Sequence, residues 1–582
     1  MKYLELASAY KELESTSKRL RKTLVISQLL KKTKESDLEK VIMLLQGRVF
    51  TQQDERDTGV AAKIVIKAIA TASGYPTNKI ENEWRKIGDL GEVTEKLISG
   101  KTQNTLFSEE LTLKIVFESL QKLATMEGQG SVDQKVKLIA KLLSIAEPLE
   151  AKYVIRTALG ELRVGVAKGT LRDAVAWAYL EGIEINYDEE KDSINPDNRD
   201  KYNKLILTVQ EALDKTNDFL TVAKAAKMGL SELQKIKLKV GTPISVMLGP
   251  KARTLAEAFK IVGRPAAIEY KYDGFRMLVN KIKDKVIIFT RRLDDVTKQF
   301  PEVKDFVIKN VRAETCMIDC EVAGYDSKTG KYTAFQSISQ RIKRKYDIEK
   351  LAKQFPVELN VFDILYLNGK DLLNTPFNER RKIIEKIINE EDKKIVLAKQ
   401  IIVDNEEDAK KFFDESVNLG NEGIMFKKLN GIYKPGSRVG YMVKYKASMD
   451  PLDVVIIGAE WGEGKRSGWL TSFSVACQSD GDYLELGKVG TGLKEKREEG
   501  LSFDEMTEIL KPLITEEKGR EVKVKPNVVV SILFDEIQKS PSYSSGYALR
   551  FPRFVVLRTD RSPEDIISVD ELEDLFFEQK KS

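Results

Sequence analysis

The stretch EYKYDGFR (residues 269–276) lies near the middle of the 582-residue chain and decides how the rest of the sequence is interpreted. As a β-strand it would place Glu269, Lys271 and Asp273 on one face and the intervening tyrosines on the other. The apolar face can then pack into a core while the polar face lines a pocket. The Asp-Gly pair favours a tight turn, which could bring Arg276 back towards the same pocket.

Within this pocket, Lys271 is the candidate nucleophile. A lysine attacks an electrophile only when it is neutral, and its unperturbed pKa is about 10.4. A nearby cation or a desolvating pocket must lower that pKa, and Arg276 or a bound metal ion could do so. The alternative is a surface lysine on an edge strand, which is the usual situation of lysines. Taken by itself, the octet leaves both interpretations open.

The composition excludes several classes of catalyst. The chain contains no histidine, which rules out Ser-His-Asp catalysis, zinc metalloproteases of the two-histidine type, facial-triad iron sites and Cys₂His₂ zinc fingers. Its three cysteines, Cys316, Cys320 and Cys477, cannot form a Cys₄ zinc site, and we expect free thiols. Acid–base and nucleophilic chemistry must therefore fall to Lys, Asp, Glu, Tyr or Arg.

Hydropathy and charge favour a cytoplasmic protein without a membrane partner. Hydrophobic residues make up 42% of the chain and charged residues 32%, which is typical of globular domains. No apolar run approaches the ~18 residues that a membrane span needs, and the charged amino terminus lacks a signal-peptide segment. The net charge of +6, from 96 basic and 90 acidic residues, is too small to establish nucleic-acid binding without local basic patches.

A chain of this length should contain several domains, and its pattern changes twice. We predict an all-α region over residues 1–232, a mixed α and β region over 233–446, and a strand-rich region over 447–582 with the short glycine-bearing turns of a small barrel. The polar segment 184–203 is expected to be a surface loop. The segment 235–250 contains two prolines and two glycines, which suggests a linker or the beginning of a domain.

Period-two patterns and one helical stretch mark the elements of the later regions. Strands are predicted over residues 266–272, 286–290, 357–367 and 453–461, and a helix over 378–389. Gly100-Lys101-Thr102 invites a P-loop interpretation, but the pattern requires a glycine where Glu95 stands, so we reject it.

The octet and the segments that follow it resemble the motifs of the covalent nucleotidyltransferases, the superfamily of DNA ligases, RNA ligases and mRNA-capping guanylyltransferases. Residues 269–276 are similar to motif I, and further motifs follow in the family's order: TRR (290–292), IDCE (318–321), VFD (361–363), EGIMFK (422–427), VKYK (443–446) and RFPR (550–553). The resemblance runs over nearly the whole chain. It is closest to ATP-dependent DNA ligases of archaeal and eukaryotic type.

This resemblance implies a helical DNA-binding domain (1–232), an α+β nucleotidyltransferase domain with an ATP-grasp-like ligase fold (233–446) and a C-terminal β-barrel OB-fold (447–582). It implies that Lys271 takes AMP from ATP, that the adenylate passes to the 5′-phosphate at a nick in duplex DNA, and that the 3′-hydroxyl then displaces AMP. Each step is an in-line displacement at phosphorus, so catalysis is mostly positioning and charge neutralisation. The family acts in DNA replication, repair, recombination and cell division, and an archaeal source is expected.

The motifs also assign roles to individual residues. By resemblance, Glu269 contacts adenine, Phe362 stacks on the base, Glu321 contacts the ribose, and Glu422 lies near a catalytic Mg²⁺ or Mn²⁺. The remaining members are basic and contact the nucleotide or, in the last two cases, orient pyrophosphate: Arg276, Arg291, Arg438, Lys444, Lys446, Arg550 and Arg553.

Two further segments point to macromolecular partners of what we expect to be a monomer. Segment 158–169 carries three glycines, whose backbone N–H groups could meet DNA phosphates without sequence readout; the alternative is an ordinary helix–helix turn. QNTLF (103–107) resembles a sliding-clamp-binding motif with Gln103, Leu106 and Phe107 as contacts; the alternative is a buried apolar pair.

Rival functions and two departures from the family pattern accompany this interpretation. An RNA ligase or a capping guanylyltransferase shares the lysine motif but normally lacks the long helical region, and a non-catalytic DNA-end-binding protein is a rival of another class. NAD⁺-dependent ligation is disfavoured because that class's four-cysteine zinc site cannot be built here. Cys320 replaces a small residue of the family, and Asn280 stands where a histidine is frequent.

Overall fold

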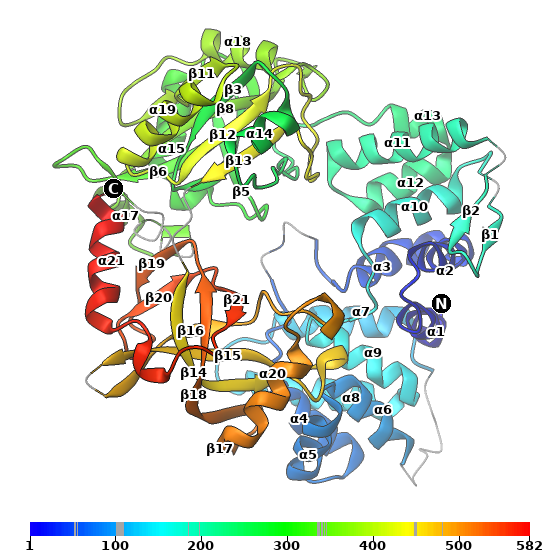
Figure 1. The fold of residues 1–582 in the computed structure, drawn as a ribbon. Helices are drawn as coiled ribbons and strands as arrows, with labels where there is room; N and C mark the ends of the chain where they lie inside the picture. The colour runs from blue at the N-terminus through cyan, green and yellow to red at the C-terminus, as the bar shows by residue number, and fades with distance from the viewer. Residues whose placement is uncertain are drawn as a thin grey trace. The chain divides into compact units, whose positions relative to one another are not determined.

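The computed structural model describes residues 1–581 except 52–53, 55, 101–109, 184, 197, 334–337, 339–340, 343, 345, 447–450 and 480. The chain separates into two compact units, whose helices and strands are labelled in Figure 1. The first unit comprises Met1–Val60, Phe107–Ser131 and Arg156–Lys446, and the second comprises Ala61–Leu106, Val132–Ile155 and Ala447–Ser582. Each unit thus joins segments that lie far apart in the sequence.

The amino-terminal part of the first unit is helical, as its periodicity predicts. Helix α1 buries Leu6, Tyr10 and Leu13 on a single stripe, and α10 packs against α2, α11 and α12. The helices of this part are α1 (Tyr3–Glu14), α2 (Arg19–Lys32), α3 (Glu35–Leu45), α7 (Leu113–Ala124), α10 (Lys168–Tyr179), α11 (Arg199–Thr216), α12 (Phe219–Met228) and α13 (Leu230–Gln234).

The polar segment 184–203 is more ordered than the predicted loop. It contains an antiparallel pair of short strands, β1 (Tyr187–Asp188) and β2 (Ser193–Ile194), and α11 already begins at Arg199. The helix begins there because the Asn198 side chain accepts a hydrogen bond from the Lys201 backbone N–H at 2.9 Å.

Two mainly antiparallel sheets form the mixed part of the first unit (Figure 1). The larger sheet has the order β10-β8-β6-β4-β5, with β7 on β6 and β9 on β8, and the smaller has the order β11-β3-β12-β13. The larger contains β4 (Phe275–Ile282), β5 (Lys285–Thr290), β6 (Thr315–Tyr325), β7 (Tyr332–Thr333), β8 (Val357–Leu367), β9 (Lys370–Asp371) and β10 (Ile395–Leu397), and the smaller contains β3 (Ala266–Lys271), β11 (Gln400–Val403), β12 (Gly423–Lys428) and β13 (Met442–Lys446). The strands predicted at 266–272, 286–290 and 357–367 are confirmed.

Helices cover the outer face of each sheet, and the inner faces share a core. The helices are α14 (Leu255–Val262), α15 (Pro301–Asn310), α17 (Ile348–Gln354), α18 (Phe377–Ile387, the helix predicted at 378–389) and α19 (Glu406–Asn418). Helix α18 packs on β8, and α14 and α19 pack on β12. Leu278, Met317 and Leu365 of the larger sheet share one buried cluster with Met442 of the smaller sheet. Polar side chains on these inner faces are therefore brought towards one another.

The second unit combines helices with a strand-rich carboxy-terminal part. Its helices are α4 (Ala62–Ser73), α5 (Thr77–Ile87), α6 (Leu90–Ser99), most of α8 (Ser131–Ile145) and of α9 (Pro148–Ala158), and later α20 (Phe503–Leu510) and α21 (Val569–Lys581). An antiparallel sheet has the order β16-β15-β14-β18-β17, with β21 on β18, and β19 pairs with β20. The strands are β14 (Leu452–Trp461), β15 (Leu470–Ser479), β16 (Asp482–Val489), β17 (Ile514–Lys518), β18 (Glu521–Leu533), β19 (Glu536–Lys539), β20 (Tyr547–Arg550) and β21 (Arg553–Leu557).

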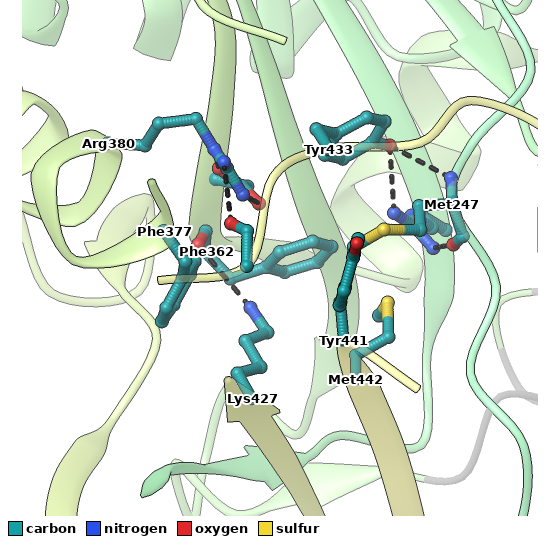
Figure 2. Close-up of a pocket in the computed structure, with 11 residues that line it drawn as sticks. Met247, Phe362, Phe377, Arg380, Lys427, Tyr433, Tyr441 and Met442 are labelled. Carbon is teal, nitrogen blue, oxygen red and sulfur yellow. Dashed lines mark hydrogen bonds and ion pairs between the residues drawn. The ribbon is translucent and has the colours of Figure 1, made fainter. Parts of the chain in front are cut away.

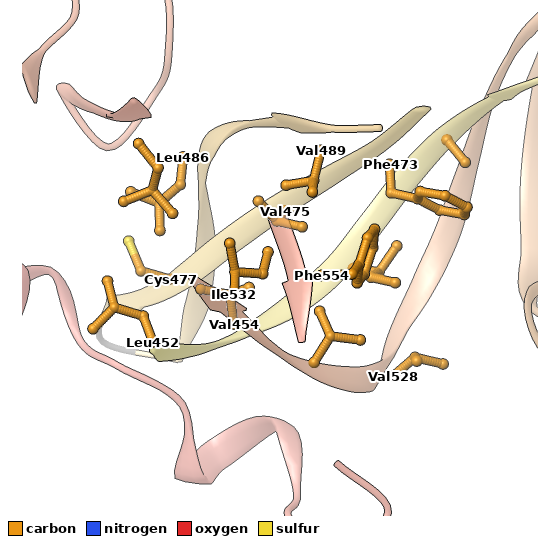
Figure 3. Packing of buried hydrophobic residues seen from close by; sticks show 14 of the residues in the cluster. Leu452, Val454, Phe473, Val475, Cys477, Leu486, Val489, Val528, Ile532 and Phe554 are labelled. Carbon is orange, nitrogen blue, oxygen red and sulfur yellow. The ribbon is translucent and has the colours of Figure 1, made fainter. Parts of the chain in front are cut away.

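One apolar core holds this strand-rich part together. Phe473 and Cys477 of β15, Ile532 of β18 and Phe554 of β21 meet in it (Figure 3). Register shifts interrupt the pairing of β14 with both β15 and β18, and such bulges bend strands around a core. The predicted strand-rich region is confirmed, whereas the OB-fold stays a prediction. Among the described helices, none combines the length and apolarity that a bilayer crossing requires.

Candidate active site

The candidate site is built on the smaller sheet, where the ends of three strands meet. Lys271 closes β3 and is registered opposite Gly423 at the start of β12, which is registered opposite Lys446 at the end of β13. Gly423 has a φ of +146°, and a Cβ there would lie 2.4 Å from the Tyr445 carbonyl oxygen, so glycine is required. The row therefore carries two lysines to one edge of the sheet with no side chain between them.

Glu422 connects these two lysines. Its Oε2 lies 2.7 Å from the Lys271 Nζ and 3.7 Å from the Lys446 Nζ. The Glu422 backbone N–H also donates to the Lys271 carbonyl at 2.9 Å, which fixes the carboxylate beside the lysine. The Lys271 and Glu422 side chains are 21% and 18% exposed, so this pair is only partly buried.

Five predicted basic residues gather around this edge. Lys444 lies two residues before Lys446 on β13 and so points to the same face. Burial lowers the pKa of Lys444, and repulsion from four neighbouring cations lowers it further: Lys271, Lys446, Arg438 and Arg291. Such a concentration of positive charge is suited to the oxygens of a polyphosphate.

The predicted nucleotide contact Arg276 is held by a buried network. Its Nε donates to Asp319 Oδ1 at 2.7 Å, its Nη2 donates to Tyr433 Oη at 3.1 Å, and its Nη1 donates to the Met247 carbonyl at 2.6 Å. The Tyr433 hydroxyl in turn donates to Asp319 Oδ2 at 2.7 Å and accepts from the Met247 N–H at 3.1 Å. Asp319 is fully buried, so this guanidinium neutralises it and is fixed in orientation.

Glu269 lies two residues before Lys271 on the same face of β3, and its carboxylate is already hydrogen bonded. Its Oε2 lies 2.5 Å from the Lys427 Nζ, and its Oε1 accepts from the Gln400 Nε2 at 2.8 Å. Arg381 lies 3.8 Å from the same Oε1. Only 2% of Glu269 is exposed, so its charge is balanced inside the protein.

An irregularity in β8 turns Phe362 towards the smaller sheet, into the space between the inner faces of the two sheets that we call the cleft. Asp363 is registered opposite Asp319 and Val361 opposite Cys320, so the pairing of β8 with β6 passes over Phe362. An extra residue of this kind re-aims side chains at an active site. Without it, Phe362 and Asp363 could not both face the smaller sheet.

A small pocket, open to solvent, surrounds the Phe362 ring (Figure 2). The Lys427 Nζ lies 4.4 Å and the Arg276 Cζ lies 5.2 Å from the centroid of that ring. Arg380 and Asp363 form a buried two-point ion pair at 2.7 and 2.9 Å in the wall behind it. An aromatic platform flanked by cations is therefore exposed to a ligand here.

Glu321 faces the cleft from β6, registered opposite Arg276 of β4. Burial raises the pKa of Glu321 to about 7, with repulsion from Glu422 and Asp319 adding to this and attraction from Lys271 and Arg276 opposing it. The carboxyl group is therefore poised between its charged and neutral forms near neutral pH. These interactions also place Glu321 in the same cluster as Lys271 and Glu422.

The carboxylates of the cleft are compatible with a phosphate-bound divalent ion. Within the described residues, no group of three or more Cys, Asp or Glu side chains is arranged to hold a metal by itself. Mg²⁺ is commonly bound by one or two carboxylates together with substrate phosphates and water. Glu422 supplies an oxygen ligand of that kind between Lys271 and Lys446, so the chemistry of the site fits such an ion.

Both departures from the family pattern have structural explanations. Cys320 points away from Asp319 and Glu321 into the core under the larger sheet, and burial raises the pKa of its thiol well above its usual value. Asn280 is fully buried, and its Oδ1 accepts a hydrogen bond from the Gly241 backbone N–H at 2.9 Å. The amide thereby ties β4 to the segment 235–250.

Four residues of the cleft were not singled out from the sequence: Lys427, Tyr433, Arg381 and Gln400. Lys427 could have been found, because it closes the EGIMFK segment and shares the strand face of Met425 and Gly423. Tyr433 could have been noticed two residues before a Pro-Gly turn. No local pattern marks Arg381 or Gln400: Gln400 meets Glu269 through the pairing of β11 with β3, and Arg381 approaches it from α18.

The remaining predicted residues are not part of the cleft as the structure describes it. Arg550 and Arg553 belong to the second unit, where the Arg550 Nη1 lies 2.9 Å from Glu536 Oε2 and Arg553 is exposed. The suggested clamp contacts Gln103, Leu106 and Phe107 fall outside the described residues.

The glycine-bearing segment 158–169 connects α9 to α10, and its predicted contact with DNA phosphates stays a prediction. Gly165 has a φ of +66°, and the Lys22 Nζ donates to the Val164 carbonyl at 2.6 Å. Burial lowers the pKa of Lys168, followed by repulsion from Arg48. Lysines of two helices therefore surround the turn, which is a suitable setting for phosphate.

Comparison with known proteins identifies families over three parts of the chain. Residues 2–176 match the family described as DNA ligase N terminus, residues 246–446 match ATP dependent DNA ligase domain, and residues 466–561 match ATP dependent DNA ligase C terminal region. The middle match contains the whole cleft described above.

Full-length relatives and a solved structure agree with these families. A DNA ligase of Nanoarchaeum equitans is 47% identical, with 100% of this chain and 99% of the relative covered, and one of Archaeoglobus fulgidus is 38% identical with 100% of each covered. A solved structure described as "Pmar-Lig_PreS3" is 17% identical, covers 95% of this chain and 99% of its own with a TM-score of 0.59, and shares the fold. The chain therefore belongs to the ATP-dependent DNA ligase family.

Proposed function

We propose that this protein seals nicks between a 5′-phosphate and a 3′-hydroxyl in duplex DNA by way of a covalent adenylate on Lys271. The observation that carries the proposal is the position of Lys271 at the edge of a cluster of four other basic side chains, on the same sheet as Lys427, which contacts the Phe362 ring. The cluster can hold a triphosphate and the platform a base. An amine fixed next to the phosphates is then placed for in-line attack.

Three displacements at phosphorus complete the reaction. The Lys271 Nζ forms a P–N bond to the α-phosphorus of ATP as the bond to pyrophosphate breaks and the amine loses a proton. A 5′-phosphate oxygen at the nick then attacks the same phosphorus, and Lys271 leaves. Finally the 3′-hydroxyl attacks the 5′-phosphorus, and AMP departs as the phosphodiester forms.

Lys271 must be neutral to attack, and its Nζ lies 2.7 Å from the Glu422 carboxylate. Binding of the nucleotide must therefore draw the two groups apart, and Lys446, 3.7 Å from Glu422, is a second cation to which this carboxylate can turn. A bound Mg²⁺ or Mn²⁺ would neutralise charge on the phosphate oxygens, with Glu422 as the residue that holds it.

The adenosine part of the nucleotide is assigned to the inner wall of the cleft. Phe362 would stack on the base, because its ring is bordered by the pocket and by two cations. Glu269 would contact adenine, with Lys427 and Gln400 fixing the carboxylate's orientation. Glu321 would accept a hydrogen bond from the ribose.

Other parts of the proposal rest on the family. We propose a helical DNA-binding domain over 1–232, a nucleotidyltransferase domain over 233–446 and an OB-fold over 447–582, acting as a cytoplasmic monomer in replication, repair and recombination. Arg550 and Arg553 would orient pyrophosphate during the first step. Segment 158–169 would contact the DNA backbone, and residues 103–107 would bind the sliding clamp.

A labelling experiment tests the central claim. The protein is incubated with Mg²⁺ and ATP labelled at the α-phosphate, and then with nicked duplex DNA or nicked duplex RNA. We expect label on the protein at Lys271, its transfer to DNA, and a sealed DNA product. Label on Lys271→Ala equal to that on the unaltered protein, or label from GTP in preference to ATP, contradicts the proposal.

A further inference from the structure

Asn360 on β8 is a buried polar side chain that the mechanism above does not use. It is 0% exposed, and neither its Nδ2 nor its Oδ1 has a hydrogen-bond partner among the described residues. Two acidic residues of the same strand have partners: Glu358 accepts from the Tyr332 hydroxyl, and Asp363 binds Arg380. A buried amide with both ends unsatisfied is uncommon in folded proteins and requires an explanation.

The alternation of β8 directs Asn360 towards the nucleotide cleft. Its neighbours Leu359 and Val361 lie in the core on the opposite face, under the larger sheet. Phe362, two residues on, packs with side chains of the smaller sheet. Asn360 therefore shares the inner face with Glu358 and Phe362.

The register places Asn360 next to a proposed ribose contact. Asn360 pairs directly with Glu321 of β6, and Glu321 pairs with Arg276 of β4, so the three side chains form one row across the sheet. Directly opposed side chains of neighbouring antiparallel strands have Cβ atoms about 4.5–5.5 Å apart. One hydroxyl group can reach both Glu321 and Asn360 at that spacing.

We infer that Asn360 binds the ribose hydroxyls of the nucleotide together with Glu321. The inference rests on the proposed function, which assigns the nucleotide to this cleft. A hydroxyl both donates and accepts, and a carboxylate can only accept from it. The Asn360 Nδ2 supplies the missing donor to the 2′-oxygen, and its Oδ1 accepts from the neighbouring 3′-hydroxyl. An adenine nucleotide without the 2′-hydroxyl leaves the Asn360 donor unpaired.

The base is the less suitable occupant for this amide. Phe362 and Glu269 already offer the base a stacking face and a carboxylate, whereas the side chains registered on either side of Glu321 are those of Arg276 and Asn360, both donors. Arg276 has its Nε and both terminal nitrogens hydrogen bonded to Asp319, Tyr433 and Met247. Asn360 is thus the uncommitted donor closest in register to Glu321.

The test compares adenylation of the full-length protein by ATP, 2′-deoxy-ATP and the triphosphate of purine riboside, which lacks the amine of adenine. We expect the unaltered protein to prefer ATP over 2′-deoxy-ATP by about tenfold or more, the effect of losing a hydrogen bond to a buried polar group. Asn360→Leu should lower that preference at least about fivefold and leave the preference over purine riboside triphosphate unchanged. Asn310→Leu, which alters a buried asparagine bonded to Glu391, is the matched control and should keep both ratios.

Three outcomes would overturn the inference: an unaltered protein that does not distinguish ATP from 2′-deoxy-ATP, an Asn360→Leu protein that keeps the ratio, or one that loses only its preference for the adenine amine. Asn360→Ser is measured in parallel, so that the result does not depend on how well the leucine variant folds. Failure of the proposed function has a different signature, because the unaltered protein would then form no adenylate with any of the three nucleotides.

Discussion

Some single side chains fix the positions of other residues in the cleft without needing to touch the nucleotide. The Tyr433 hydroxyl is the clearest case, because it contacts Asp319, Arg276 and the Met247 N–H at once. It therefore holds together β4, β6 and the segment that precedes β3. Its ring is fully buried, so no water can replace the hydroxyl if it is removed.

Replacing Tyr433 with phenylalanine should weaken the use of ATP without unfolding the protein. The change leaves the Met247 N–H and one Asp319 oxygen without this partner, which costs about 1–3 kcal/mol and loosens Arg276. We expect the KM for ATP in protein adenylation to rise about five- to tenfold, with a smaller change in the maximal rate. Tyr441→Phe alters another tyrosine of the same pocket and is the control. An unchanged KM in Tyr433→Phe would show that the network is dispensable.

Glu321 should make the stability of the first unit depend on pH. Its pKa rises from 4.5 in the unfolded chain to about 7 in the fold, so the folded state binds the extra proton and loses stability as pH rises between these values. Glu321→Gln should melt like the unaltered protein near pH 5 and be more stable above pH 7. Allowing for partial exposure, we expect a gap on the order of 1 kcal/mol, or about 2–4 °C. Thermal melts across this range test it, and a pH-independent gap would contradict it.

At the scale of elements, the segment 235–250 is the main surprise. Its Pro and Gly content suggested a linker or the start of a domain, and the structure shows it hydrogen bonded along the cleft. The Leu248 N–H donates to the Ser437 carbonyl at 2.9 Å, and the Lys444 N–H donates to the Pro250 carbonyl at 2.9 Å. The chain leaving the last helix of the helical part is thereby attached to residues that would bind phosphate.

A substitution at Gly249 should disturb this attachment. A Cβ at position 249 would lie 2.7 Å from the Met442 carbonyl oxygen, which is backbone and cannot move aside cheaply. We expect Gly249→Ala to slow protein adenylation about tenfold by displacing the segment from β13. Gly100→Ala is the control, because its Cβ meets nothing closer than 3.5 Å. Equal adenylation rates for the two variants would mean that the segment tolerates displacement.

Features set by neighbouring residues could be predicted from the sequence, whereas contacts between distant strands could not. The strands at 266–272 and 357–367 and the row of Glu269 and Lys271 could be predicted, because hydrophobic alternation is a property of neighbouring residues. The pairing of Glu269 with Lys427 and Gln400 could not, since it depends on which strands become neighbours. The unpaired state of Asn360 was equally hidden, because nothing near it in the sequence indicates burial without a partner.

At the scale of the whole molecule, the residues with predicted roles are divided between two units. Lys271, the proposed nucleophile, and the basic cluster belong to the first unit, and Arg550 and Arg553 belong to the second. A substitution in the second unit should therefore slow only those steps of the reaction that need both units. The steps can be measured separately by starting the reaction from different intermediates.

Replacing Arg553 with alanine should impair the first step selectively. If Arg553 orients pyrophosphate, its loss should slow protein adenylation by ATP about tenfold or more, because a charge contact to the leaving group is lost. Sealing of a nick that already carries the 5′-adenylate should keep its rate. Arg497→Ala removes another arginine of the second unit, one paired with Asp504, and serves as control. Equal slowing of both reactions would point to a general role in DNA binding instead.

The clamp motif gives a second prediction at this scale. Phe107→Ala should abolish stimulation of nick sealing by the sliding clamp, because the aromatic side chain is the expected anchor in an apolar pocket of the partner. Unstimulated sealing should be unaltered. Pull-down of the variant by the clamp at the level of the unaltered protein would defeat the idea.

The ion pair between Lys271 and Glu422 has a consequence for the resting enzyme. The Lys271 Nζ lies 2.7 Å from a carboxylate oxygen and its side chain is 21% exposed, so cyanate, aldehydes and acylating metabolites reach this nitrogen less readily than that of a surface lysine. Without this contact, part of the ligase in a cell would slowly be blocked at Lys271, whose proposed role no other side chain can take. The same contact that delays the first chemical step thus preserves the nucleophile between substrates.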